Sequence, residues 1–136
     1  MSYKTLKVKV FGREEEVIPK VFLYKAKDFM GKEMPVLGIQ LYTSTECGAP
    51  IPYATLTTSF GEFFFLKNCA YIDTNNCPFA AQFIEMGLAE DVGLTKERGM
   101  CSYPLWSFNE EFLREIGGAE YEQYCKAFDQ YGCYSR

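Results

Sequence analysis

The chain has 136 residues with 48% hydrophobic and 24% charged side chains, which suits one globular domain and excludes a disordered tail. Its formal net charge is −4, whereas a protein that grips duplex DNA through many phosphates is usually basic. The absence of histidine excludes Ser-His-Asp and Cys-His catalysis and histidine-ligated zinc. There is neither a run of about 20 apolar residues to span a membrane nor a signal-peptide pattern, so we expect a cytoplasmic protein without a membrane segment.

The first 72 residues have the pattern of short strands joined by turns. Apolar side chains alternate with Lys7 and Lys9, which is the period of a strand with one buried face. No helix-length segment separates these strands, so we predict an antiparallel meander. Pro19 cannot donate a backbone hydrogen bond, so its strand is expected to be an edge or to carry a bulge. The expected strands are 4–11, 14–24, 35–43, 53–59, 63–66 and 69–72.

Helical signals begin at residue 73. Asp73, Asn75 and Asn76 are cap-forming residues that precede Pro78, and Phe79 starts an apolar series at helical spacing. A hairpin over 92–95 and 100–106 follows, and the run 107–110 (Ser-Phe-Asn-Glu) has the form of a capping box. The expected helices are about 77–86, 109–116 and 120–131, with Gly117-Gly118 separating the last two. These elements predict a single α+β domain over residues 1–136: one antiparallel meander sheet of about five to six strands packed with about three helices, one central and two C-terminal.

The polar run at 73–76 has two interpretations. The start of a helix can bind an anion such as phosphate. Alternatively, Asn75 or Asn76 caps the helix while Asp73 closes a local turn, since side chains of this type bond nearby backbone groups. We favour the structural interpretation for Asp73, Asn75 and Asn76, because the Asp73 carboxylate would repel a phosphate.

The six cysteines form no recognisable metal or disulfide pattern. The chain lacks Cys-x-x-Cys, and nothing implies export to an oxidising compartment, so we expect free thiols that pack as small apolar residues. We predict no metal site and no cofactor. A cysteine-dependent enzyme stays an alternative, since Cys77 stands at the start of an expected helix, but no catalytic residues can be assigned and we expect a protein that is not an enzyme. The cysteines are Cys47, Cys69, Cys77, Cys101, Cys125 and Cys133.

Negative charge is concentrated near the C-terminus. Residues 85–136 contain five Lys and Arg against ten Asp and Glu. An acidic surface there would favour the binding of a basic partner. Alternatively, these charged residues only keep the protein soluble. The candidate partner-binding residues, expected on the outer faces of the last two helices, are Glu110, Glu111, Glu115, Glu120, Glu122 and Asp129.

Residues 52–108 resemble a family of uncharacterised small bacterial proteins that are typically encoded on conjugative and other mobile elements. The resemblance is carried by the segments Pro52–Thr57 (PYATLT), Ala70–Asn76 (AYIDTNN), Gly87–Ala89 (GLA) and Tyr103–Leu105 (YPL), followed by Phe108. It implies a genomic context and no catalytic residues.

These observations predict a non-enzymatic accessory protein that acts by binding another macromolecule. The leading hypothesis is a counter-defence inhibitor of the anti-CRISPR or anti-restriction type, whose acidic surface occupies a basic nuclease or nucleic-acid-binding protein. The alternative is a protein that binds single-stranded nucleic acid through Lys7, Lys9 and exposed aromatic residues such as Phe60 and Phe63–Phe65.

Overall fold

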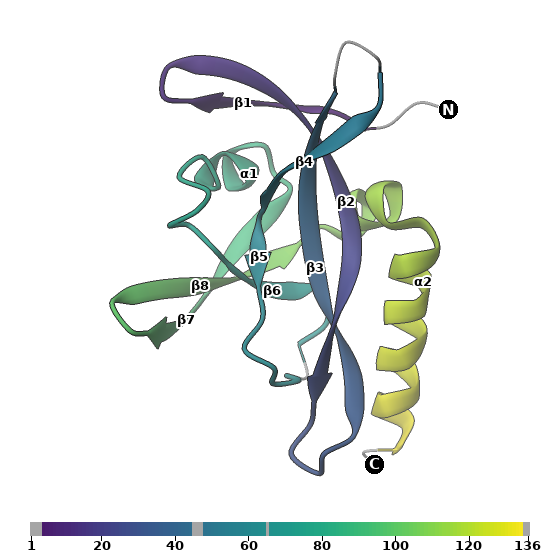
Figure 1. Ribbon diagram of the computed structural model, residues 1–136. Coiled ribbons are helices and arrows are strands. Elements are labelled where there is room, and N and C mark those ends of the chain that lie inside the picture. Colours follow the sequence, from purple (N-terminus) through teal and green to yellow (C-terminus); the bar gives the residue numbers. More distant parts are fainter. Residues whose placement is uncertain (1–3, 45–47, 65, 135–136) are drawn as a thin grey trace.

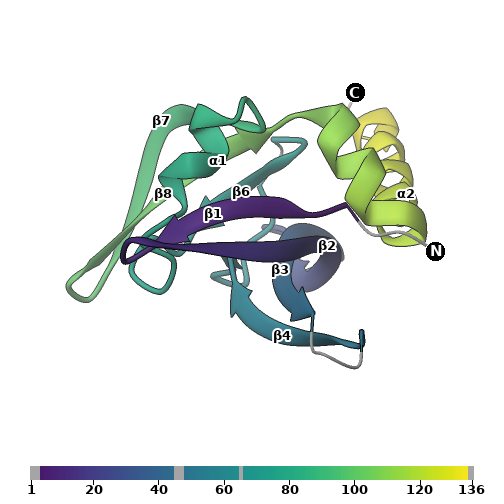
Figure 2. The same cartoon turned by 90° about the horizontal axis from the view of Figure 1, so that it is seen from above.

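The computed structural model describes residues 4–44, 48–64 and 66–134. These form two four-stranded sheets, with strand orders β1-β2-β3-β4 and β5-β6-β8-β7. Helix α2 lies along one side of the β2–β3 hairpin, whereas α1 and the β7–β8 hairpin lie on the other side (Figures 1 and 2). The elements are β1 (Leu6–Val10), β2 (Arg13–Lys27), β3 (Glu33–Ser44), β4 (Pro50–Thr55), β5 (Thr57–Thr58), β6 (Cys69–Ile72), α1 (Ala81–Glu85), β7 (Ala89–Arg98), β8 (Cys101–Phe108) and α2 (Glu110–Tyr134).

The fold is α+β with antiparallel sheets, as the sequence predicts, but the prediction of one meander sheet and three helices is wrong. The described residues contain two sheets and two helices. Neither helix in the described ranges combines the length and the apolar composition needed to cross a membrane.

The second sheet exists because the predicted strand 53–59 is interrupted at Leu56. β4 pairs with β3, whereas β5 pairs with β6. The Leu56 N–H donates to the Ile39 carbonyl at 3.0 Å, and the Leu56 carbonyl accepts from the Asp73 N–H at 2.9 Å. The chain therefore passes from the first sheet into the second at Leu56, and backbone bonds tie this residue to both.

Thr57 completes this junction and is 2% exposed. Its Oγ1 accepts a hydrogen bond from the Ile39 N–H at 3.0 Å, and its carbonyl accepts one from the Tyr24 hydroxyl at 3.1 Å. Since a buried polar group without a partner costs free energy, the bond from the Ile39 N–H to Oγ1 explains why a hydroxyl is tolerated at this position.

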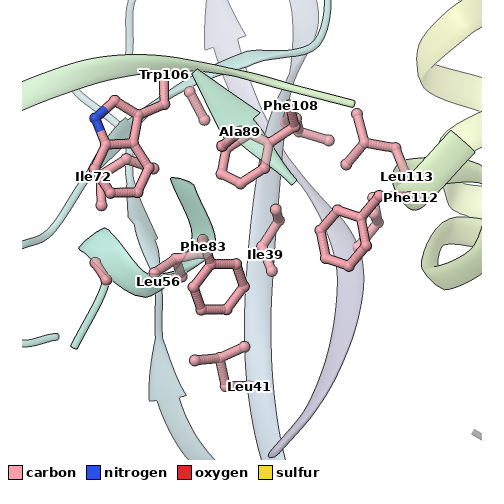
Figure 3. Packing of buried hydrophobic residues seen from close by; sticks show 14 of the residues in the cluster. Ile39, Leu41, Leu56, Ile72, Phe83, Ala89, Trp106, Phe108, Phe112 and Leu113 are labelled. Atoms are coloured by element: carbon pink, nitrogen blue, oxygen red, sulfur yellow. The ribbon is translucent and has the colours of Figure 1, made fainter. Parts of the chain in front are cut away.

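The hydrophobic core lies between the two sheets and is closed by α1 and by both parts of α2. Figure 3 shows Phe83 of α1, Phe108 of β8 and Phe112 of α2 converging on Ile39 and Leu56. The Phe112 ring lies 6.5 Å from Phe83 and 6.5 Å from Phe108, measured between centroids. The aromatic residues of the sequence thus fill a core to which both sheets contribute.

Both helices begin later than the sequence predicts. α1 covers Ala81–Glu85 in place of about 77–86, because turn bonds such as Ala80 N–H to the Cys77 carbonyl hold the preceding residues. Helix α2 begins at Glu110, and the Phe112 N–H donates to Asn109 Oδ1 at 3.2 Å. Asn109 is therefore the N-cap, which is two residues after the serine of the expected capping box.

The helix break predicted at Gly117-Gly118 lies inside α2. Gly118 has φ 51° and ψ −133°, a conformation that is open to glycine and costly for other residues. A Cβ on Gly117 would lie 2.3 Å from Cβ of Tyr121. The two glycines therefore allow the bend that lets both parts of α2 reach the core.

The structure also differs from two predictions about strands. Residues 63–66 form no strand in the part of the segment that is described: Phe63 packs on Phe128 at 5.5 Å, whereas Phe64 packs on Tyr71 at 5.5 Å. Phe65 lies outside the described residues. β2 is central in its sheet and not an edge, but its pairing with β1 ends before Pro19, so the proline interrupts no β1–β2 bond.

Replacing Thr57 with valine tests the junction between the sheets. Thr57→Val keeps the side-chain shape but leaves the Ile39 N–H without its acceptor, so the free energy of unfolding should fall by about 1–3 kcal/mol. Chemical denaturation measures this change. Thr58→Val on the same strand is the matched control and should change stability by no more than about 0.5 kcal/mol; equal effects of both variants would contradict the role of Thr57.

Candidate functional site

A cluster of aromatic and basic side chains lies on the outer face of the second sheet. In an antiparallel pair, residues that stand opposite one another project from the same face. Lys96 stands opposite Tyr103, and Arg98 stands opposite Cys101, two residues from Tyr103. Tyr71 stands opposite Leu105, again two residues from Tyr103. These side chains therefore share one face, and the opposite face carries Trp106 and the core.

Phe60, from the segment that follows β5, packs against this face. Its ring centroid lies 5.4 Å from that of Tyr71 and 5.3 Å from that of Tyr103. Lys96 Nζ lies 5.0 Å and Arg98 Cζ 5.6 Å from the same centroid, within the range of cation–π contacts. The rings are half-buried, so part of each faces solvent. We call the following residues the Phe60 patch: Phe60, Phe64, Tyr71, Lys96, Arg98 and Tyr103.

Glu62 limits the positive charge of the Phe60 patch. Its Oε2 lies 2.9 Å from Lys96 Nζ, and both side chains are partly exposed. An exposed pair of this kind contributes about 0–1 kcal/mol and is easily exchanged for another anion. Arg98 has no carboxylate partner among the described residues. A hollow of about 40 Å³ beside Phe60 and Tyr71 is too small for anything larger than a water or a methyl group.

A groove of about 520 Å³ separates the β2–β3 hairpin from α2. This volume lies within the usual range for ligand sites. Its lining combines apolar residues with the carboxylates of Glu33 and Glu120 and the amine of Lys25. Glu33 and Glu120 form no ion pair with any described residue. The other lining residues are Val21, Phe22, Leu23, Tyr24, Met34, Pro35 and Gln123.

Three of the six candidate acidic residues are engaged in ion pairs. The distances are 3.6 Å for Glu110–Arg114, 3.2 Å for Glu115–Lys4 and 3.6 Å for Asp129–Lys67. These pairs lower the negative charge that a partner would meet.

The remaining acidic candidates do not share a face. Glu111 lies in the first turn of α2, where a carboxylate is stabilised by the helix dipole. At 100° per residue, Glu122 projects from the same flank of α2 as Asp129, and Glu120 projects from the other flank. Only Glu120, among the six, lines the groove. The structure therefore does not assemble the six residues into one acidic surface.

Lys7 and Lys9 do not lie with the aromatic residues proposed beside them. They project from β1 in the first sheet, whereas Phe60 and Phe64 pack on the second. Lys7 lies 3.9 Å from Glu14 on the neighbouring strand. The backbone of Lys9 exchanges two 2.8 Å hydrogen bonds with the Gln82 side chain, which ties β1 to α1. The predicted combination of Lys7, Lys9 and Phe60 is therefore not formed.

The polar run at 73–76 is a turn. Asp73 Oδ1 accepts a hydrogen bond from the Asn76 N–H at 3.1 Å, as expected for a side chain that closes a local turn. Neither Asn75 nor Asn76 caps α1, because that helix begins at Ala81 and has no side-chain cap. Asp73 also donates its N–H to Leu56, so the run positions the sheet junction.

The cysteines within the described residues, Cys69, Cys77, Cys101 and Cys125, are free thiols. Burial, with the Asp73 carboxylate nearby, raises the pKa of the Cys77 thiol from 9.0 to about 11. Burial also raises the pKa of Cys69. Both thiols are therefore protonated at neutral pH, and the thiolate is the reactive form. Among the described residues, no three cysteine or carboxylate side chains are placed to hold a metal ion.

A family model described as a domain of unknown function, DUF4313, matches residues 26–128. The chain belongs to the DUF4313 family. Neither the curated proteins nor the solved structures that were searched contain a match. The DUF4313 region is longer than the segment 52–108 on which the sequence resemblance rests, and it contains the whole Phe60 patch together with Glu33 and Glu120. An uncharacterised family is thus confirmed, and the association with mobile elements stays a prediction.

Phe60 and Phe63–Phe65 are candidate aromatic residues in the sequence, which does not place them beside Lys96 and Arg98. The turn centred on Gly99 and Met100 pairs Arg98 with Cys101 and Lys96 with Tyr103, whereas the hairpin predicted over 92–95 and 100–106 leaves Lys96 and Arg98 in its loop. The sequence carries no signal for the contacts of Phe60, because they depend on how the segment after β5 packs on the second sheet. The groove has none either, since Glu33 and Glu120 are 87 positions apart in the chain.

The raised pKa of Cys77 predicts a loss of stability at alkaline pH. From pH 9 to about pH 11 the thiol ionises in the unfolded chain but not in the folded protein, so the free energy of unfolding falls as pH rises. Cys77→Ala removes this contribution and should show a shallower decline over the same range, measured by denaturation with a reducing agent present. Tyr24 and Tyr124 also have raised pKa values, but they titrate in both proteins. Identical slopes in the two proteins would contradict the assignment to Cys77.

Proposed function

We propose that this DUF4313 chain is a non-enzymatic accessory protein that binds a basic segment of a second protein in the groove between β2–β3 and α2. The observation that carries the proposal is a groove of mixed apolar and polar lining that contains two carboxylates, Glu33 and Glu120, with no cationic partner among the described residues.

The lining of the groove suits a lysine or arginine side chain. Such side chains place their methylene stems on apolar surface and keep the charged head near water or a carboxylate. Leu23 and Pro35 supply partly exposed apolar surface, and Glu33 and Glu120 supply carboxylates. Because Lys25 also lines the groove, we propose that one or two cationic side chains bind there and not a long basic run.

The net charge of the chain supports the same class of partner. At −4, the protein attracts a basic surface over longer distances, which raises the association rate more than the affinity. The narrower form of the proposal is a counter-defence protein that inhibits a basic nuclease or nucleic-acid-binding protein. It rests on the resemblance of residues 52–108 and on this charge.

Removing the two groove carboxylates tests the proposal. Glu33→Gln/Glu120→Gln, immobilised beside the native protein, should lose about tenfold or more of its binding to basic proteins from bacterial lysate, quantified by mass spectrometry. Binding to the native protein should weaken as salt rises, because exposed charges are screened.

Glu111→Gln/Glu122→Gln is the matched control. It removes the same charge from α2 outside the groove and should keep most of the binding. The proposal is wrong if the control loses as much binding as the groove variant, or if no captured protein depends on Glu33 and Glu120.

A further inference from the structure

We propose that the Phe60 patch is a binding site for single-stranded nucleic acid, separate from the groove. Unstacked bases would lie on the half-buried rings, and the phosphates between them would lie against Lys96 and Arg98. This inference does not depend on the proposed protein partner, since the two surfaces share no residue.

The rings supply the stacking surface. Phe60, Tyr71 and Tyr103 come from three different segments and meet at centroid distances of 5.3–5.4 Å. Such edge-to-face contacts hold the rings in place without covering them completely, and each remains partly exposed. Bases stack on rings of this kind whatever their sequence, so we expect weak sequence preference.

The cations lie where a phosphate backbone would run. Lys96 and Arg98 occupy alternate positions of β7 and therefore project from one face, roughly 7 Å apart along the strand. The β7–β8 hairpin extends away from α2, the helix that carries all six candidate acidic residues (Figure 1). Arg98 adds a planar guanidinium group, which can stack on a base as well as bind a phosphate.

Single strands fit this surface better than duplexes. A duplex hides its base faces, so the rings could contribute little to binding it. With two cations at the patch and a net charge of −4, phosphate contacts alone would not hold a duplex tightly.

Glu62 provides a test that distinguishes a ligand site from a structural salt bridge. Its carboxylate holds Lys96 at 2.9 Å, so a phosphate must displace it. A residue that competes with the ligand can be removed with a gain in affinity, whereas a purely structural salt bridge would give no such gain.

Fluorescence anisotropy with a labelled oligothymidylate of about 12 nucleotides tests the site at about 50 mM salt. The native protein should bind this probe and discriminate against a duplex of the same length. Phe60→Leu should weaken binding about tenfold. Arg98→Gln should weaken it as well and lower the salt slope by about 0.7. Glu62→Gln should strengthen it.

Lys7→Gln/Lys9→Gln is the matched control, because it removes two positive charges from β1 and should leave affinity within about twofold. Glu33→Gln/Glu120→Gln should likewise have little effect, which separates this site from the groove. The exposed positions Arg98 and Glu62 carry the test if Phe60→Leu does not fold. The inference is overturned if the native protein fails to retain the probe, if Lys7 and Lys9 matter as much as Arg98, or if Glu62→Gln weakens binding.

Discussion

The fold depends on the hydrogen bonds at Leu56 and Thr57, where one extended segment leaves the first sheet and enters the second. The backbone of Leu56 bonds to Ile39 in β3 and to Asp73 after β6, and the Thr57 hydroxyl accepts the Ile39 N–H. These bonds hold the two sheets in a fixed relative orientation around a shared core. The junction joins β3 to the second sheet, and Phe60, three residues after Thr57, packs on the outer face of that sheet.

The same junction explains the most concentrated polar motif of the sequence. Asp73 supplies one backbone bond to Leu56, and its side chain closes the turn that leads toward α1. Its charge also contributes to the raised pKa of Cys77. A run of cap-forming residues that could have bound an anion is thus accounted for by local structure.

Charge is distributed differently in space than along the chain. The acidic C-terminal part of the sequence becomes a helix whose carboxylates point to several sides, and three of them pair with Lys4, Lys67 and Arg114. Two carboxylates far apart in sequence, Glu33 and Glu120, line the same groove instead. Lys96 and Arg98, which lie beside the Phe60 ring, belong to the acidic half of the chain. The contacts of individual charged side chains therefore describe the surface of this DUF4313 protein better than the net charge of a sequence region does.

The sequence alone determined the α+β class, most strands, the β7–β8 hairpin, the helix break at Gly117-Gly118 and the turn at Asp73, because each depends on periodicity or on a local backbone preference. It did not determine the second sheet, the Asn109 cap, the groove or the Phe60 patch. Strand periodicity does not show that the pairing partner changes at Leu56, and two side chains 87 positions apart line one groove only when α2 packs on β2–β3. Tertiary packing decided which charged and aromatic residues meet, because such contacts depend on distances in space that no local pattern encodes.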